Sequence, residues 1–403
     1  MNIKFRNYNL LPVQLSRKNV NGYRVFKIRD LLVQNSIESA FINPHDPRWA
    51  EFLAKCPHGV HHQPAYVKLA AKHEGGEAAA FWARCQGCEL LIPLVVRDLP
   101  KETSLQGLRD AATPYGYAAP LIYPLTNKVG VNKPCTVEDL NRATLLLECL
   151  RGECSRCGII SVFSRMHPLL STPLTPFKRC GSLVAHAETV YVDLQSSETS
   201  VLWRQLRRAF RKSIRQLLNQ GFTGVVDEFG HLPQFYEMYL DTMRRRRAKP
   251  FYFFDWDYFE TLVGTPTLEP HLCSVLNPEG ELVAAILYLG TAGTLEAFLG
   301  GWRESYSHLA VSKLSYWFMI EWAQQQSREC LHLGGGVGGA DDSLLNFKRG
   351  FSPLSAPFYT WRLICDAEKY QAAVQAWVSQ SKFSVEESFF PEYRRYIVGD
   401  GCE

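Results

Sequence analysis

The chain has 403 residues, of which 46% are apolar and 21% are charged, and its formal net charge at pH 7 is +4. These values are ordinary for a globular protein, and they exclude a long disordered chain and a histone-like polycation. The length exceeds what one hydrophobic core usually supports, so two domains are expected.

The amino-terminal residues 1–7 contain no apolar core of the kind that a secretory signal peptide needs. The longest weakly charged stretch, 282–302, includes Glu296 and several glycines, which favours two strands and a turn over a membrane span. The twelve cysteines are scattered, which indicates reduced thiols rather than a disulfide framework. We therefore expect a cytoplasmic protein without stable membrane insertion.

The first half of the chain, apart from residues 1–40, shows clear periodic patterns. Gln86-Gly87 joins two apolar runs, which predicts a β-hairpin, and a later helix carries a face of leucines. We expect helices over 46–55, 63–72 and 137–153, and strands over 78–85, 88–97 and 158–163.

The second half repeats this order of elements. We expect helices over 203–219, 233–243, 309–326 and 367–379, and strands over 222–227, 271–276, 282–289, 293–300, 329–333 and 357–364. The segment 86–94 also resembles 279–287, and the unequal spacing indicates a duplicated domain rather than a solenoid. The predicted domains are 1–190 and 191–403, with the boundary near 185–194.

A glycine-rich loop follows the strand at 329–333. Gly334, Gly336 and Gly339 satisfy G-x-G-x-x-G, but no acid stands about twenty residues later, as a dinucleotide fold needs. No Gly-Lys-Ser/Thr follows either, which argues against a P-loop. A flexible turn is the alternative, but the glycine content favours a ligand-binding loop. The loop residues expected to contact substrate are Gly335, Gly336, Gly338 and Gly339.

The segment 203–215 carries six positive charges and no acid. Its apolar residues fall at helical spacing, so the cations, Arg208 and Arg211 among them, are expected on the exposed face. This face is either a solvated surface or a binding surface for a polyanion such as tRNA or a nucleotide diphosphate.

Polar and aromatic side chains follow the strand and loop of the first half. Arg165 is a candidate anion clamp because of its forked donors, and His167 is either a general base or a structural histidine. Tyr115 and Tyr117 form either an aromatic floor under a sugar or base, or a packed turn.

Two Cys-x-x-Cys pairs, Cys85/Cys88 and Cys154/Cys157, are too far apart in the sequence for a zinc ribbon, and no metal site is expected. No Gly-x-Ser-x-Gly or His-Glu-x-x-His occurs, so hydrolase and zinc-protease functions lack their usual motifs.

Three motifs together resemble the FemAB-like branch of the GNAT superfamily, which includes BioF2-like acetyltransferases. They are Thr113-Pro114-Tyr115-Gly116-Tyr117, the segment 163–168, and above all 332–353, which contains Phe347-Lys348-Arg349-Gly350-Phe351. The resemblance covers about 40–365 and implies an α+β fold: two tandem GNAT-like domains, each a mixed, mainly antiparallel sheet flanked by helices.

The resemblance also implies an N-acyltransferase acting on an amine of a cell-envelope precursor, such as a nucleotide- or lipid-linked amino sugar. The co-substrate is expected to be acyl-CoA; the alternative is aminoacyl-tRNA, as in Fem-type peptidyltransferases of peptidoglycan synthesis. Lys348 is expected near the donor carbonyl and Arg165 at the acceptor phosphate. A non-catalytic GNAT-like binding module is the second alternative.

Two further roles stay open. Asp341 or Asp342 is expected to help remove the amine proton, with Asp342 the preferred catalytic residue, although helix capping also suits one of them. Arg303 stands where coenzyme-A-dependent GNAT enzymes begin their pyrophosphate loop, but the glycines of that loop are missing from 303–308, which strengthens the tRNA alternative.

Overall fold

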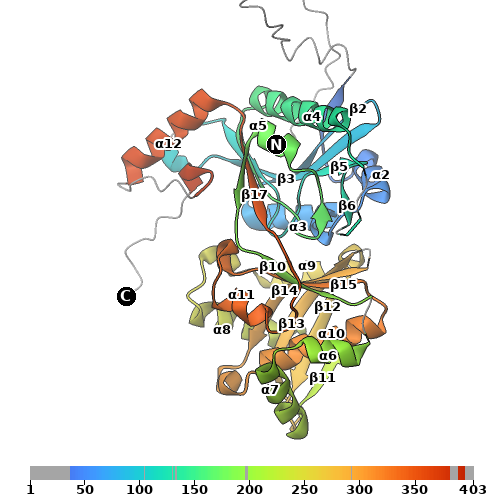
Figure 1. The fold of residues 1–403 in the computed structure, drawn as a ribbon. Helices are drawn as coiled ribbons and strands as arrows, with labels where there is room; N and C mark the ends of the chain where they lie inside the picture. The colour runs from blue at the N-terminus through green and yellow to red at the C-terminus, as the bar shows by residue number, and fades with distance from the viewer. Residues whose placement is uncertain are drawn as a thin grey trace, which may run out of the picture.

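The computed structural model describes residues 37–103, 105–128, 130–131, 134–195, 198–291, 293–381 and 389–394, arranged as two lobes (Figure 1). The unassigned amino-terminal stretch 1–36 lies outside the described residues. Each lobe is built on one large mixed sheet with helices packed against it.

The first sheet has the strand order β1-β2-β3-β4-β7-β17-β9, with β5 paired to β3. These strands are β1 (Glu38–Ile42), β2 (Glu77–Cys85), β3 (Cys88–Asp98), β4 (Arg109–Ala112), β5 (Leu121–Tyr123), β7 (Ile159–Arg165), β9 (Ser182–Ala185) and β17 (Tyr359–Ile364). The helices of this lobe are α2 (Pro47–Lys55), α3 (Pro64–Glu74), α4 (Val137–Arg156), α5 (Thr175–Cys180) and α12 (Ala367–Ser381).

The second sheet has the order β11-β12-β13-β14-β15-β10-β16. Its strands are β10 (Thr189–Asp193), β11 (Thr223–Val226), β12 (His271–Leu276), β13 (Leu282–Thr291), β14 (Thr294–Trp302), β15 (Cys330–Gly334) and β16 (Ser355–Ala356). Its helices are α6 (Thr199–Gln205), α7 (Arg208–Asn219), α8 (Leu232–Arg245), α9 (Trp256–Val263), α10 (Val311–Gln325) and α11 (Ser343–Lys348).

Shorter elements connect these strands and helices. A small two-stranded sheet pairs β6 (Asn127–Lys128) with β8 (Leu170–Ser171). Single 3-10 turns are η1 (Val60–His62), η2 (Lys101–Thr103), η3 (Phe229–His231), η4 (Pro250–Tyr252), η5 (Pro266–Leu268), η6 (Glu304–Leu309), η7 (Val337–Gly339) and η8 (Glu392–Arg394).

The two sheets share one topology. In each, antiparallel strands lead to one parallel pair, β4 with β7 and β14 with β15, and the crossover of each pair contains a helix, α4 or α10. The parallel partner is then followed by an antiparallel neighbour, β17 or β10. The predicted fold class, two tandem α+β domains that are each a mixed, mainly antiparallel sheet flanked by helices, is confirmed.

The two lobes exchange a strand. Residues 359–364, assigned from the sequence to the second domain, form β17 of the first sheet (Figure 1, orange-red), and α12 also packs on the first lobe. β10 meanwhile enters the second sheet directly after β9 of the first. The division 1–190 and 191–403 therefore does not hold for the last fifty residues, because the strand after α11 returns to pair with β7 and β9.

A hydrophobic core joins the two lobes. Tyr66 and Leu69 of α3 pack in one buried cluster with Phe235 of α8 and Phe259 of α9. Burial of such large side chains stabilises the relative placement of the lobes as it would the interior of one domain.

The prediction of a single basic helix over 203–219 is wrong in one respect. Leu206 and Arg207 adopt extended backbone, so the segment forms two helices, α6 and α7. Phe210 and Ile214 are buried as expected, and the cations face outward.

Candidate active site between the two lobes

The glycine loop begins where β15 ends and stays accessible. Gly334 and Gly338 have φ of +80° and +63°, values that glycine adopts without steric cost. Val337 is 66% exposed, and no atom lies within 4 Å of where a Cβ on Gly338 would stand. The loop therefore has open space beside it at Gly338.

Asp342 caps the helix that follows. Its carboxylate accepts hydrogen bonds from the backbone N–H groups of Leu345 and Val337, both at 2.9 Å. Burial would raise the pKa of Asp342, but these N–H donors outweigh it and lower the pKa. Asp342 is thus an N-cap that also ties η7 to α11, and Asp341 pairs with Arg349 at 2.8 Å.

Lys348 stands at the end of α11 and reaches back to the loop. Its Nζ donates a hydrogen bond to the carbonyl oxygen of Gly335 at 2.7 Å. Burial lowers the pKa of Lys348 to about 8, although Asp342 acts in the opposite direction. The amine is therefore mostly, but not fully, protonated at neutral pH.

Tyr117 of the first lobe meets Lys348 over Gly334. A Cβ placed on Gly334 would lie 3.2 Å from Lys348 Nζ and 3.4 Å from the Tyr117 hydroxyl. The Tyr117 ring also lies 4.9 Å from the ring of His332, and burial raises the pKa of its hydroxyl. The two predicted residues, one from each lobe, thus belong to one site.

Arg165 and Tyr115 form the neighbouring part of the site. The Arg165 guanidinium lies over the rings of Tyr115 and Phe163, at 5.8 and 5.1 Å from their centroids. Within the described part of the chain it has no carboxylate partner. A half-buried guanidinium held on aromatic rings remains available to an anion.

His167 contacts a carboxylate that the sequence reasoning did not select. Its Nε2 lies 3.3 Å from Oε1 of Glu296, whose Oε2 lies 3.5 Å from His332 Nδ1 and 3.6 Å from His61 Nδ1. All four side chains are buried. The only sequence signal was a lone glutamate within an apolar strand, and its partners lie far away in the chain.

Two glycines of the first lobe allow these side chains to approach. A Cβ on Gly116 would lie 2.2 Å from the His61 ring, and one on Gly59 would lie 2.5 Å from His167 Nε2. The glycine in Thr113-Pro114-Tyr115-Gly116-Tyr117 is therefore required by the close contact with His61.

The predicted donor-binding residues lie outside this cluster. Arg303 is exposed at the start of η6, and Arg208 is exposed on α7. Arg211 donates to the carbonyl oxygens of Arg204 and Leu206 at 2.6 and 3.1 Å, so it caps the end of α6. These residues are not brought together with Lys348, although α7 packs on the Lys348 segment through Phe210 and Gly350.

The Cys-x-x-Cys segments have ordinary structural surroundings. Cys85 and Cys88 are buried free thiols opposite each other across the β2-β3 hairpin, and Cys154 lies on the buried face of α4. Over the described ranges, no group of three or more His, Cys, Asp or Glu side chains has an arrangement that would hold a metal ion.

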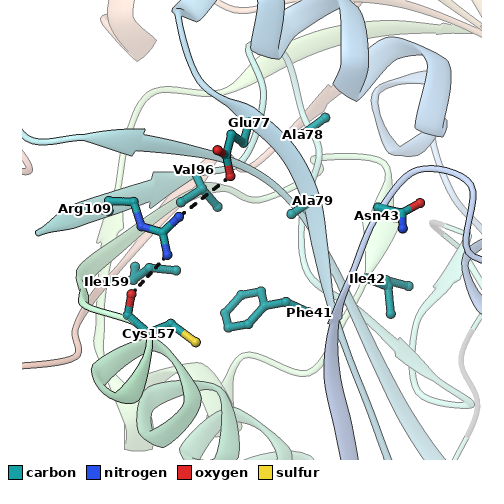
Figure 2. A pocket seen from close by; sticks show the side chains of 10 residues that line it. All are labelled: Phe41, Ile42, Asn43, Glu77, Ala78, Ala79, Val96, Arg109, Cys157 and Ile159. Carbon is teal, nitrogen blue, oxygen red and sulfur yellow. Dashed lines mark hydrogen bonds and ion pairs between the residues drawn. The ribbon is translucent and has the colours of Figure 1, made fainter. Parts of the chain in front are cut away.

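A separate, small hollow of about 30 Å³ lies on the first lobe (Figure 2). It is mostly lined by apolar residues of β1, β2 and β3, and its Arg109 already contacts Glu77 and the carbonyl of Cys157. Arg109 and Ile159 begin β4 and β7, whereas Tyr115 and His167 follow the ends of these strands. The hollow is therefore at the opposite end of the sheet from the site.

Residues 204–349 match the model of the acetyltransferase (GNAT) domain family. This segment is therefore similar to a GNAT acetyltransferase domain. The match spans α7 to α11 and so includes Glu296, His332 and Lys348. A comparison with curated protein sequences gives no match.

Solved structures extend the similarity to both lobes. A crystal structure of FemX is 12% identical, with a TM-score of 0.58 over 83% of this chain and 99% of its own. L-PGS from Bacillus licheniformis (13% identity, TM-score 0.49, 79% and 92% coverage) is a weaker match. So is a tandem GNAT protein from the clavulanic acid biosynthesis pathway (12%, 0.44, 82% and 98%). The FemX comparison supports a FemAB-like GNAT fold.

Across the described part of the chain, every helix is too short or too polar to cross a membrane.

Proposed function

We propose that the protein is an N-acyltransferase that transfers an acetyl or similar acyl group to an amine of a cell-envelope precursor, such as a nucleotide- or lipid-linked amino sugar. The observation that carries the proposal is the position of Lys348. Its Nζ lies at the open glycine loop and beside Tyr117 of the other lobe. A cation at this point can stabilise the oxygen of an acyl group held between the lobes.

Amide formation requires positioning of the amine and stabilisation of the negative charge that develops on the acyl oxygen. Lys348 is a donor for this oxygen, because its Nζ lies at the accessible glycine loop. No covalent intermediate on the protein is needed.

Arg165 gives the site its preference for an anionic acceptor. Its guanidinium lies over two aromatic rings, one of which is Tyr115 of the segment that also carries Tyr117. Forked N–H donors in this setting suit a phosphate, which nucleotide- and lipid-linked sugars both carry.

A non-catalytic binding module would be favoured by an occluded loop or by a Lys348 directed into apolar packing. Neither is the case, because Val337 is exposed and Lys348 bonds to the Gly335 carbonyl. The enzyme interpretation is therefore preferred.

Aminoacyl-tRNA is the second candidate donor. Arg208, Lys212 and Arg215 are exposed on α7, which contains no acid and packs against the Lys348 segment. The six residues of η6 also replace the glycine loop that coenzyme-A-dependent GNAT enzymes use for pyrophosphate. The FemX-like fold is consistent with this donor.

The test is a transfer assay with two donors, acetyl coenzyme A and alanyl-tRNA, and two acceptors, a UDP-linked amino sugar and a UDP-linked muramoyl peptide that carries lysine. Amide product is detected by mass spectrometry. Lys348→Ala should lower turnover by about 10²–10³-fold, the cost of one oxyanion donor. Arg165→Ala should mainly raise the KM for the acceptor.

Near-normal turnover by Lys348→Ala would remove Lys348 from the mechanism, and absence of product from every pair would contradict the proposed function. A steep loss of rate with salt would identify the tRNA donor, since phosphate contacts are screened by salt.

A further inference from the structure

A buried carboxylate surrounded by imidazoles lies in the interface between the lobes, and the roles proposed for Lys348 and Arg165 do not involve it. Glu296 is 5% exposed. His61 and His167 reach it from the first lobe and His332 from the second. A buried charge is retained only where partners compensate for its desolvation, so this cluster requires an explanation.

Glu296 and His332 occupy a particular point of the second sheet. They are the last residues of β14 and β15 that pair in parallel; beyond them the two strands no longer pair. Leu295, Leu331 and Leu333 belong to the core beneath α10, so by alternation Glu296 and His332 face the first lobe. β15 then ends at Gly334, next to the Gly335 carbonyl to which Lys348 Nζ donates.

The charge state of the cluster follows from its surroundings. Burial would raise the pKa of Glu296, but the neighbouring imidazoles hold it well below its usual range. Burial lowers the pKa of His61 to about 4, and it lowers the pKa of His332 against the opposing effect of Glu296. At neutral pH, Glu296 is therefore ionised and these two histidines are neutral.

Hydrogen bonds assign the ring protons. The backbone N–H of Leu169 donates to His167 Nδ1 at 3.1 Å, so His167 carries its proton on Nε2 and donates it to Glu296. His332 Nδ1 likewise donates to Glu296. His332 Nε2 is then a lone-pair acceptor, and it is buried with no hydrogen-bond partner in the described structure.

We propose that His332, oriented by Glu296, is the base that deprotonates the attacking amine, and that His61 and His167 hold Glu296 in position from the other lobe. This inference rests on the proposed function. A buried acceptor nitrogen without a partner, oriented by a carboxylate on its other side, is the arrangement of a general base. The long contacts to Glu296 leave room to tighten when substrate binds.

In this step the acceptor arrives as an ammonium, and one proton passes to His332 Nε2 and later to solvent. The free amine nitrogen forms a bond to the acyl carbon, and the bond from that carbon to the sulfur or oxygen of the donor breaks. The leaving sulfur or oxygen takes the second proton of the amine, and the third stays on the amide.

Other charged or titratable groups surround this base. Tyr117 covers the His332 ring, and Lys348 adds a positive charge that lowers the pKa of His332. The groups facing the cluster from the packed elements are His61, His62, Arg165, His167, Cys330 and Lys348, with Tyr117.

The experiment compares Glu296→Gln and His332→Gln with wild type, using acetyl coenzyme A and the UDP-linked amino sugar, or alanyl-tRNA and the lysine peptide where only that pair reacts. His271→Gln is the matched control. His271 also contacts a carboxylate, Asp227 at 2.9 Å, but it lies on β12, two strands away from β14 in the same sheet.

Both site variants should lose about 10²–10⁴-fold in kcat/KM for the acceptor at pH 7, the usual contribution of a general base, while the control retains its rate. The kcat/KM of wild type divided by that of the variant should then shrink by about tenfold for each unit by which the pH rises, because the acceptor amine loses its proton in solution. Lys348 is present in all proteins compared, so its titration cancels in this ratio.

An equal loss at every pH, or no loss, would overturn the proposal, because a purely structural role does not depend on the acceptor's proton. If Glu296→Gln does not fold, His332→Gln carries the test.

Nitrogen-15 spectra of the imidazoles in the substrate-free protein add a readout that does not depend on activity. Wild type should show His332 protonated on Nδ1, and the opposite tautomer would also overturn the proposal. Failure of the proposed function can be distinguished from failure of this proposal, because wild type itself would then form no amide.

Discussion

Lys348 combines two properties that a catalytic cation needs. It is fixed by a hydrogen bond to Gly335, and burial brings its pKa to about 8. A charge held in a desolvated position stabilises an oxyanion more strongly than a charge in water does.

The first prediction concerns the pH dependence of this charge. Because the folded pKa of Lys348 is about 8, the ammonium is complete well below pH 8 and is lost as pH rises through that value. We expect kcat/KM to fall above about pH 8 in wild type. Lys348→Arg keeps its charge throughout, since guanidinium does not titrate in this range, so the decline should disappear. A pH profile of both proteins checks this, and an unchanged decline in the Arg variant would assign it to another group.

Local motifs identified only part of the site. Tyr117, Arg165 and His167 lie at a strand end or beside a glycine, and Lys348 ends the short helix after the glycine loop. Sequence patterns at such places carry information about ligand contacts. Glu296 and its histidine partners could not be identified in this way. A glutamate in the alternating pattern of β14 reads as a solvent-facing residue, and only long-range packing places His61 and His167 over it.

At the scale of elements, α11 presents Lys348 and depends on its cap. Asp342 accepts from Leu345 and Val337, so one carboxylate fixes both the helix and the loop. With these N–H groups bound and its pKa lowered, Asp342 is better suited to this role than to that of a base.

The second prediction separates these two roles of Asp342. Asn is as good an N-cap as Asp but has no carboxylate, so Asp342→Asn should retain activity and unfold within a few tenths of a kcal/mol of wild type. Asp342→Ala should lose about 0.5–2 kcal/mol of stability and some turnover, because the cap is lost. Denaturant unfolding and the transfer assay measure both effects. Loss of turnover in the well-folded Asn variant would restore Asp342 as a catalytic residue.

Most helices and strands were predictable because their periodic patterns are local. The break between α6 and α7 was not, since its cause is tertiary: the Arg207 N–H donates to the Gly350 carbonyl at 2.8 Å, outside any helix. The apolar spacing through Trp203, Leu206 and Phe210 is equally compatible with one continuous helix.

At the scale of the whole molecule, the exchange of strands between the two sheets could not be predicted from the sequence either. An apolar strand pattern over 359–364 fits an inner position in either sheet, and nothing local specifies which one. In the structure β17 comes from the second lobe and joins the first sheet, and β10 comes directly after β9 of the first sheet and joins the second. Each sheet therefore contains a strand that follows directly from the other lobe. The site between the lobes is thereby fixed at its edges as well as by the shared core.

The last prediction is that the two lobes unfold together. Independent domains would unfold in separate transitions, but here a shared core and two exchanged strands must be lost at once. Leu147→Ala in α4 and Leu314→Ala in α10 each empty a fully buried position in a different lobe, at a cost of about 2–5 kcal/mol. Calorimetry should show one transition, lowered in temperature by either substitution, and little change for Val137→Ala, an exposed position at the start of α4. Two transitions, each sensitive to only one of the core substitutions, would show that the lobes are stable separately and that the strand exchange contributes little to holding the site together.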